Sequence, residues 1–309
     1  MSDGGPALVQ YIATRLAHPV LPPIETAALT IADRLGGVAV LFYGSMLRTG
    51  ELDGVADFYV LTKAAPEHGA AALRARLLWP DVSYHEVTVD GQTIRAKVAT
   101  MPIDLFARAA RGATLDTTIW ARFVQRAALI WAATGAVQIC VVGAVAAAAI
   151  TSARFAAVIG PRSGAPAAFW KALFQETYQT ELRFEKPGRE VQILDFDAEH
   201  YDRLLPLAWA ADGLSFDTST DGALSPRLDG KRSAYLFESW RACAVAAKPL
   251  NVARLVKAAF TFEGATRYAL WKIHRHTGIR VPVTPFRERH PILAAPGVLW
   301  RVWLATAAR

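Results

Sequence analysis

Cysteine is nearly absent from this chain, because only Cys140 and Cys243 occur among its 309 residues. Two cysteines so far apart in the sequence argue against a disulfide scaffold and fit a reducing compartment. The chain also shows no low-complexity run and no internal repeat. Its first residues contain no basic segment that leads into an apolar one, and we therefore expect neither a secretory signal nor an Arg-rich transit peptide.

Charge is missing from residues 127–153. A bilayer-spanning helix needs about 20 apolar residues, so the length of this stretch permits a membrane span. Its high alanine content and its interruption by Thr134, Gly135 and Gln138 favour a soluble core instead. We expect the end of a helix, a short strand over residues 137–142 and the start of a second helix.

The overall charge is positive, with a net value of +7 and a pI of about 9.6. This balance suits an acidic partner, namely nucleic acid, a nucleotide or an anionic membrane surface, and does not choose among them. The chain is 53% hydrophobic and longer than one compact domain usually requires. We expect two domains, over residues 1–142 and 143–309.

The first half alternates helical and strand patterns. We expect helices over residues 7–16, 24–35, 66–78, 103–111 and 117–132, and strands over residues 38–43, 57–61, 82–89 and 93–100. The last two strands flank Asp90-Gly91, which is a strong hairpin signal. This order predicts an α/β fold with a small mixed sheet.

The second half is mainly helical in pattern. We expect helices over residues 167–177, 198–211, 234–247, 252–262 and 265–274, with a strand over residues 180–185 and a loop over residues 212–232.

A candidate site lies between the first two strands. Gly44 and Ser45 follow a buried strand directly, and Asp57 opens the next one. A glycine lets the backbone approach a phosphate closely, and the following amides and the Ser45 hydroxyl can donate to phosphate oxygens. The Asp57 carboxylate is suited to hold Mg²⁺ against those phosphates. The alternative is an ordinary turn.

These residues also carry a resemblance. Tyr43-Gly-Ser45 followed by Asp57-Phe-Tyr-Val resembles the nucleotidyltransferase core of the mitochondrial-type phosphatidate cytidylyltransferases, also called mitochondrial translocator assembly and maintenance proteins. Further segments resemble that family in the same order over roughly residues 38–276: Val82-Ser-Tyr-His with Ile94-Arg-Ala-Lys97-Val-Ala, Tyr178-Gln-Thr-Glu-Leu-Arg183, Pro249-Leu-Asn, Lys257-Ala-Ala-Phe-Thr261, Tyr268 and Lys272.

The resemblance implies a polymerase-beta-like nucleotidyltransferase domain followed by a mainly helical domain. It implies an enzyme that makes CDP-diacylglycerol from CTP and phosphatidate with Mg²⁺ and releases pyrophosphate. Asp57, Ser45, Lys97 and Glu181 are then the expected catalytic residues. The expected nucleotide contacts are Tyr43, Gly44, Ser45, Lys97, Arg183, Lys257 and Lys272. For Glu181 and Arg183 a surface ion pair is the alternative, and for Lys97 a solvated edge-strand lysine.

The sequence departs from the family pattern at three places. Met46 stands where the family has a second glycine, and Lys97-Val-Ala-Thr replaces Lys-Tyr-Gly-Val. Tyr59 occupies the position of the second acid in the Asp-x-Asp pair of polymerase-type sites. A second metal ligand must then come from Asp53, Glu86 or Glu181, and Asp53 before a glycine is also a typical turn residue.

The C-terminal part combines basic residues with tryptophans. Trp300 and Trp303 stand beside Arg301, behind a basic series formed by Arg254, Lys257, Arg267, Lys272, His274, Arg275, His276, Arg280, Arg287, Arg289 and His290. Such a segment suits peripheral docking on an anionic bilayer, and the alternative is a helix packed on the core by its tryptophans. We expect a cytoplasmic protein on the inner face of the membrane.

Two other functions stay open. A nucleotidyltransferase that acts on protein or nucleic acid is compatible with the charge, although no stacked-aromatic strand motif or recognition helix supports a nucleic-acid partner. The altered Met46 and Lys97 segments also fit a catalytically decayed scaffold of lipid biosynthesis.

Overall fold

The protein is described by a computed structural model that covers residues 4–63, 78–180, 189–289, 293–298 and 300. Its first half contains α1 (Gly4–Leu16), α2 (Pro22–Arg34), β1 (Gly37–Tyr43), α3 (Ser45–Thr49), β2 (Ala56–Thr62), β3 (Asp81–Val89), β4 (Gln92–Pro102), α5 (Ile103–Ala110), α6 (Thr118–Phe123) and β5 (Ala127–Ala132). The expected helix over residues 66–78 falls almost wholly outside the described residues.

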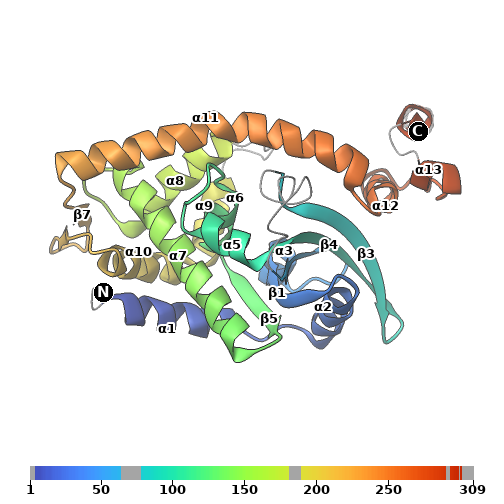
Figure 1. Ribbon diagram of the computed structural model, residues 1–309, viewed down its shortest axis with the longest axis horizontal. Coiled ribbons are helices and arrows are strands. Elements are labelled where there is room, and N and C mark those ends of the chain that lie inside the picture. The colour runs from blue at the N-terminus through green and yellow to red at the C-terminus, as the bar shows by residue number, and fades with distance from the viewer. Residues whose placement is uncertain (1–3, 64–77, 181–188, 290–292, 299, 301–309) are drawn as a thin grey trace.

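The second half follows with α7 (Gly135–Ile159), α8 (Pro166–Thr180), α9 (Arg189–Phe196), α10 (Ala198–Ala211), β6 (Phe216–Thr218), β7 (Leu224–Pro226), α11 (Gly230–Thr261), α12 (Ala265–Thr277) and α13 (Pro285–Arg289). Figure 1 shows α11 running along the length of the molecule and ending beside α12.

The five strands of the first half form one mixed sheet in the order β3-β4-β2-β1-β5. Strand β2 runs parallel to β4, whereas the β1–β2, β1–β5 and β3–β4 pairs are antiparallel. The hairpin between β3 and β4 turns at Asp90 and Gly91, which both have positive φ, as the sequence predicted. The fold is therefore α/β, with a mixed sheet and many helices.

The sheet is buried on both faces because its side chains alternate between two hydrophobic clusters. Leu41, Tyr59 and Ala99 face the larger cluster, which α1, α5, α6, α7, α8 and α10 share. Val40, Phe58 and Val98 face a smaller cluster closed by α2. Continuous apolar runs such as β1 are typical of strands with both faces covered.

The expected elements around residues 117–153 are wrong in two respects. Residues 127–132 form β5 on the edge of β1 instead of ending a helix, and residues 137–142 lie inside the helix α7 instead of forming a strand. The Thr134 side chain caps α7 by accepting a hydrogen bond from the Val137 amide at 3.2 Å. A capped start followed by an alanine-rich run outweighs the strand preference of valine.

The two helices expected over residues 234–247 and 252–262 are one continuous helix, α11, with Pro249 inside it. A proline deprives the carbonyl four residues earlier of its hydrogen-bond donor. Here that carbonyl belongs to Val245, which is 75% exposed. Water can therefore donate to it in place of the missing amide. The helix therefore continues through the proline.

Two smaller expectations also need correction. Thr180 ends α8 instead of starting a strand, and the rest of the expected strand, residues 181–185, lies outside the described residues. The expected loop over residues 212–232 contains the β6–β7 hairpin and the first turn of α11.

One described helix, α7, is long and apolar enough to cross a membrane by length and composition, and 56% of its most apolar window is buried within the protein.

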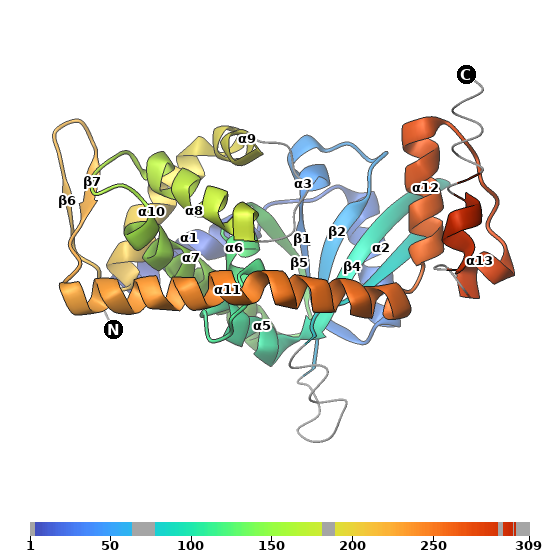
Figure 2. The same cartoon turned by 90° about the horizontal axis from the view of Figure 1, so that it is seen from above.

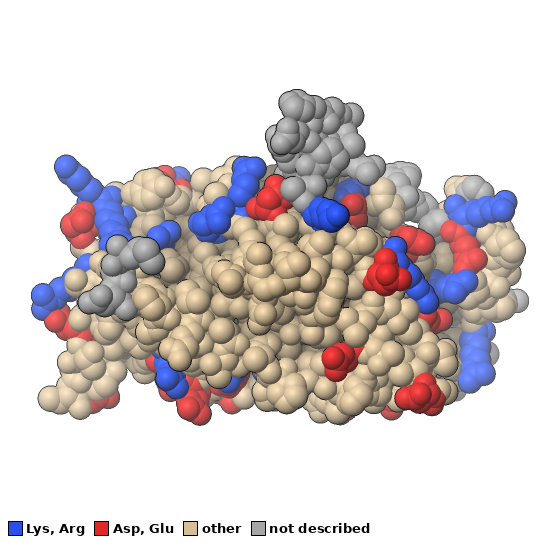
Figure 3. All heavy atoms as spheres, turned by 60° about the horizontal axis from the view of Figure 1, so that its bottom comes forward, with Lys and Arg blue, Asp and Glu red and all other residues tan. Residues whose placement is uncertain are grey.

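The helix also passes through the expected domain boundary at residues 142 and 143. Its lower end and α1 lie on the side that Figure 3 brings forward, where the centre of the surface carries few charged side chains.

Candidate functional site

The predicted site residues meet in one row across the sheet. Tyr43 pairs with Asp57, Asp57 with Lys97, and Lys97 with Tyr84. Directly paired residues on neighbouring strands point to the same face, and three strand spacings place the row within roughly 14 Å. This face is the one that α5, α6 and α7 cover further along the strands. The sheet thus brings together Tyr43, Asp57 and Lys97 from three separate strands.

Gly44 stands against the carboxylate of this row. Its φ is +91°, a backbone conformation that L side chains rarely adopt, and an added Cβ would lie 2.5 Å from Asp57 Oδ2. A glycine is therefore required here by both backbone conformation and space. Ser45, the next residue, begins α3 and is exposed. The sharp turn expected at Gly44 is confirmed, whereas its contact with phosphate stays a prediction.

The electrostatic surroundings of Asp57 are cationic. Burial raises the pKa of the Asp57 carboxyl, and the positive charges of Lys97, Arg122 and Arg48 act in the opposite direction. Three basic side chains thus act on this one carboxyl group. Basic side chains gathered from β4, α6 and α3 are suited to an anionic ligand with several phosphate oxygens.

Arg122 is a site residue that the sequence did not reveal. It lies on α6, and its Nη1 atom donates to the hydroxyl oxygens of Tyr43 at 3.2 Å and Tyr59 at 3.4 Å. Its guanidinium also lies 5.0 Å from the centre of the Tyr43 ring. These contacts orient the guanidinium beside Asp57. Burial raises the pKa of the Tyr43 phenol, so its hydroxyl stays protonated at neutral pH.

The two departures closest to the site have structural explanations. Tyr59 is fully buried and packs against Phe123 with ring centres 5.2 Å apart, so the expected position of a second acid belongs to the core. Met46 is also buried, in the hydrophobic cluster on the opposite face of the sheet from Asp57. A bulky residue after Gly44-Ser45 therefore does not fill the space beside the carboxylate.

Helix α12 brings two further residues towards the row. The Tyr268 ring lies 5.5 Å from that of Tyr84, and the charge of Asp57 adds to the effect of burial in raising the pKa of Tyr268. Lys272 is exposed, and its Nζ lies 5.9 Å from the centre of the Tyr268 ring. In Figure 2, α12 lies across from α3 and the start of β2.

Lys257 does not join this row. Its Nζ donates to the carbonyl oxygens of Leu78 and Pro80, and it forms an ion pair with Asp81 Oδ1 at 2.6 Å. Asp81 pairs with Thr100, three residues along β4 from Lys97, which is about 10 Å away. These acceptors occupy the ammonium group, and the contact holds α11 against the start of β3.

The candidates for a second metal ligand are dispersed. Asp53 is exposed in the turn before β2, and Glu86 accepts a hydrogen bond from the Tyr84 hydroxyl at 2.9 Å. Glu181, like Arg183, lies outside the described residues. Within the described parts of the chain, no group of three or more His, Cys, Asp or Glu side chains is arranged to hold a metal ion.

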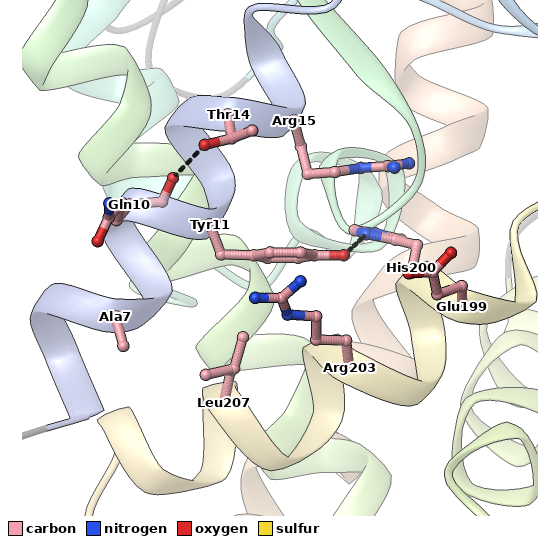
Figure 4. A pocket seen from close by; sticks show the side chains of 9 residues that line it. All are labelled: Ala7, Gln10, Tyr11, Thr14, Arg15, Glu199, His200, Arg203 and Leu207. Atoms are coloured by element: carbon pink, nitrogen blue, oxygen red, sulfur yellow. Dashed lines mark hydrogen bonds between the residues drawn. The ribbon is translucent and has the colours of Figure 1, made fainter.

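A separate pocket of about 430 Å³ lies between α1 and α10, where Figure 4 shows Tyr11 pointing towards His200. The Tyr11 hydroxyl is 2.8 Å from His200 Nδ1, and His200 Nε2 is 3.1 Å from the carbonyl oxygen of Val124. That carbonyl requires a proton on Nε2, so Nδ1 accepts from the tyrosine. Because these polar groups satisfy one another, we assign them to the packing of α1.

No family model matches the chain, and a search of curated proteins finds no match.

Proposed function

We propose that this protein is a Mg²⁺-dependent nucleotidyltransferase that transfers the cytidylyl group of CTP to phosphatidate, forming CDP-diacylglycerol and pyrophosphate. The observation that carries the proposal is the row in which Gly44 lies against Asp57 while Lys97, Arg122 and Arg48 surround that carboxylate. The resemblance of the segments around Tyr43, Asp57 and Lys97 to the phosphatidate cytidylyltransferases supplies the base and the acceptor.

The reaction requires stabilisation of negative charge. A phosphate oxygen of the acceptor attacks the α-phosphorus of CTP, the bond to the bridging oxygen breaks, and pyrophosphate leaves with the electron pair. Lys97, Arg122 and Arg48 offset the charge of the triphosphate and of the leaving group. The exposed Ser45 hydroxyl donates a hydrogen bond to a phosphate oxygen from the start of α3.

The row around Asp57 fits Mg²⁺ if substrate phosphates and water supply the other ligands. Mg²⁺ is commonly held by one or two carboxylates together with substrate phosphates and water, and Asp57 is the carboxylate that the row offers. Asp57 would hold a magnesium ion that arrives with the nucleotide, and the ion would neutralise charge on the departing pyrophosphate. Asp53 and Glu181 remain candidates for further ligands.

The acceptor implies peripheral docking on the inner face of a membrane. Phe286 is 58% exposed, Leu293 71% and Trp300 61%, and the exposed Arg289 lies among them in the sequence. Apolar and basic side chains in one segment suit the boundary of an anionic bilayer. Removing residues 286–309 should therefore reduce sedimentation with phosphatidate vesicles while CTP binding survives. Unfolding of the truncated protein would instead assign this segment to the core.

The direct test is incubation of the purified protein with labelled CTP, Mg²⁺ and phosphatidate vesicles. Labelled lipid that depends on Mg²⁺ and is absent with Asp57→Asn is the expected result. Transfer of label to RNA or to protein, with none to lipid, would assign the site to another nucleotidyltransferase class. Absence of any Mg²⁺-dependent CTP binding would favour the non-catalytic scaffold.

A further inference from the structure

A pocket of about 620 Å³ lies between α12 and the segment 280–283 that follows it. Its apolar wall is formed by Leu270, Trp271, Val281, Pro282 and Val283. Three basic side chains also line it, namely Arg267, His274 and Arg280. The pocket therefore combines a hydrophobic surface with cationic groups, which are the two chemistries of an anionic amphiphile.

The charged residues of this pocket differ in whether a residue of opposite charge pairs with them. Its acidic residue, Glu86, accepts a hydrogen bond from Tyr84 and lies 3.7 Å from Arg95 Nε. Arg267 forms an ion pair with Glu288 at 2.7 Å. Arg280, in contrast, donates from Nε to His274 Nε2 at 3.4 Å, and no carboxylate in the described parts of the chain pairs with it. Arg280 is exposed and is the cation best placed to receive an anionic head group.

A series of aromatic rings connects this pocket with the candidate site. Tyr84, which pairs with Lys97, lies 5.5 Å from Tyr268, and Tyr268 stacks on Trp271 at 6.4 Å. Trp271 is part of the pocket wall. Tyr84 is two strands from Asp57, which places their backbones on the order of 10 Å apart, and Tyr268 and Trp271 extend the series beyond Tyr84 to the pocket. A lipid held in the pocket must therefore move its head group across this distance to react.

We propose that this pocket is the first binding site of the acceptor lipid as it leaves the bilayer, with the phosphate head group held by Arg280 and His274 and part of an acyl chain against Trp271 and Val283. The head group then moves to the row around Asp57, where the reaction occurs. Val283 is 46% exposed, so the apolar wall continues to the protein surface, where a chain can enter from a bilayer. This inference rests on the proposed function, since it assigns the lipid half of that reaction to named residues.

The test measures binding of soluble ligands by titration calorimetry to the full chain. Dihexanoyl phosphatidate supplies head group and chains, glycerol 3-phosphate supplies the head group alone, and dihexanoyl phosphatidylcholine supplies chains with a blocked phosphate. We expect dihexanoyl phosphatidate to bind at least tenfold more tightly than either other ligand. Equal binding of glycerol 3-phosphate would reveal a site for free phosphate and overturn the lipid assignment.

Two variants locate the binding. Arg280→Glu removes the cation and Val283→Asp places a charge in the apolar wall, and each should weaken dihexanoyl phosphatidate at least tenfold. Arg162→Glu is the matched control, because Arg162 is exposed and lies beside the β6–β7 hairpin at the other end of the molecule. Affinity for CTP should be unchanged in all three variants. Wild-type lipid affinity in both pocket variants would contradict the proposal.

The two proposals fail in different ways. If labelled CTP reacts with phosphatidate while Arg280→Glu and Val283→Asp bind lipid normally, the proposed function stands and the pocket is excluded. If lipid binding depends on Arg280 and Val283 while no transfer occurs, the pocket stands and the proposed reaction fails.

Discussion

The row around Asp57 and the cluster around His200 resemble each other in composition. Each combines a buried titratable group, a tyrosine and at least one arginine. Around His200 both ring nitrogens have partners in the protein, Tyr11 and the Val124 carbonyl, and the Arg203 guanidinium lies 5.1 Å from the centre of the Tyr11 ring. Around Asp57 a single carboxylate faces three cations beside the exposed Ser45.

The difference shows which observation points to a ligand. Burial shifts the pKa of both groups, raising that of Asp57 and lowering that of His200 to about 4. A shifted pKa therefore does not distinguish a binding site from a packing contact. The arrangement of the charges does, because cations from three separate elements act on the Asp57 carboxyl, whereas the hydrogen bonds of His200 are completed within the fold.

The largest effect expected from the comparison is that of Gly44→Ala. The new Cβ would meet Asp57 Oδ2 at 2.5 Å, and the φ of +91° disfavours any side chain. We expect the rate of nucleotidyl transfer to fall at least 100-fold, which corresponds to an increase of about 2.7 kcal/mol or more in the activation free energy. Steady-state transfer of labelled CTP measures the loss.

Gly50→Ala is the matched control for that change. Gly50 has a similar φ of +72°, but an added Cβ there would meet nothing within 4 Å. The backbone strain should cost about 1 kcal/mol of stability and leave the transfer rate near that of the wild type. Equal loss of activity in both variants would mean that strain in the fold, not displacement of Asp57, causes the defect.

The second effect concerns the phosphate contacts. Lys97→Ala should weaken CTP binding by about 10-fold to 100-fold, because a charge-assisted hydrogen bond contributes on the order of 1.5–3 kcal/mol. Ser45→Ala should weaken it by about fivefold, since a neutral hydrogen bond contributes on the order of 1 kcal/mol. Titration calorimetry with CTP and Mg²⁺ compares the two. CTP binding by Lys97→Ala that equals that of the wild type would exclude a phosphate contact for the β4 lysine.

A smaller effect, on stability alone, is expected at His200. Burial lowers its pKa to about 4 in the folded protein, while the unfolded chain binds the proton near 6.5. The unfolded state therefore holds more protons between these values, and the free energy of unfolding falls as the pH drops through them. The loss amounts to roughly 3 kcal/mol.

His200→Gln removes this titration. The free energy of unfolding of the wild type, measured in urea at pH 7.5 and pH 4, should drop by about 3 kcal/mol more than that of the variant. If the free energy of unfolding fell by the same amount in both proteins, His200 would bind a proton in the folded protein as easily as in the unfolded one. Transfer activity at pH 7.5 should be retained, in contrast with Gly44→Ala.

The sheet was largely predictable from the sequence because local signals agree there. The apolar run of β1, the break at Gly44 and the Asp90-Gly91 turn each specify one structure. Strand β5 was not predictable, because residues 127–132 become a strand only by pairing with the edge of β1, far away in the sequence. The prediction of two helices around Pro249 was wrong because a residue that usually breaks helices is tolerated on an exposed helix face.

The site was predictable only in part. Gly44, Asp57 and Lys97 were expected, and their meeting in one row follows from strand pairing. Arg122 was not expected, because it lies on α6, 65 residues after Asp57, without a motif around it. Lys257 was expected at the nucleotide, but Leu78, Pro80 and Asp81 bind its ammonium group. Only the fold decides which basic residues face the carboxylate.

The most direct test of the central claim is the dependence of CTP affinity on Mg²⁺ in the wild type and in Asp57→Asn. If Asp57 holds a metal that arrives with the triphosphate, Mg²⁺ should tighten CTP binding at least tenfold in the wild type and have little effect in the variant. Both proteins should unfold cooperatively, which urea titration verifies. The same tightening in both would contradict the assignment of Asp57 as a metal ligand, and with it the proposed nucleotidyltransferase site.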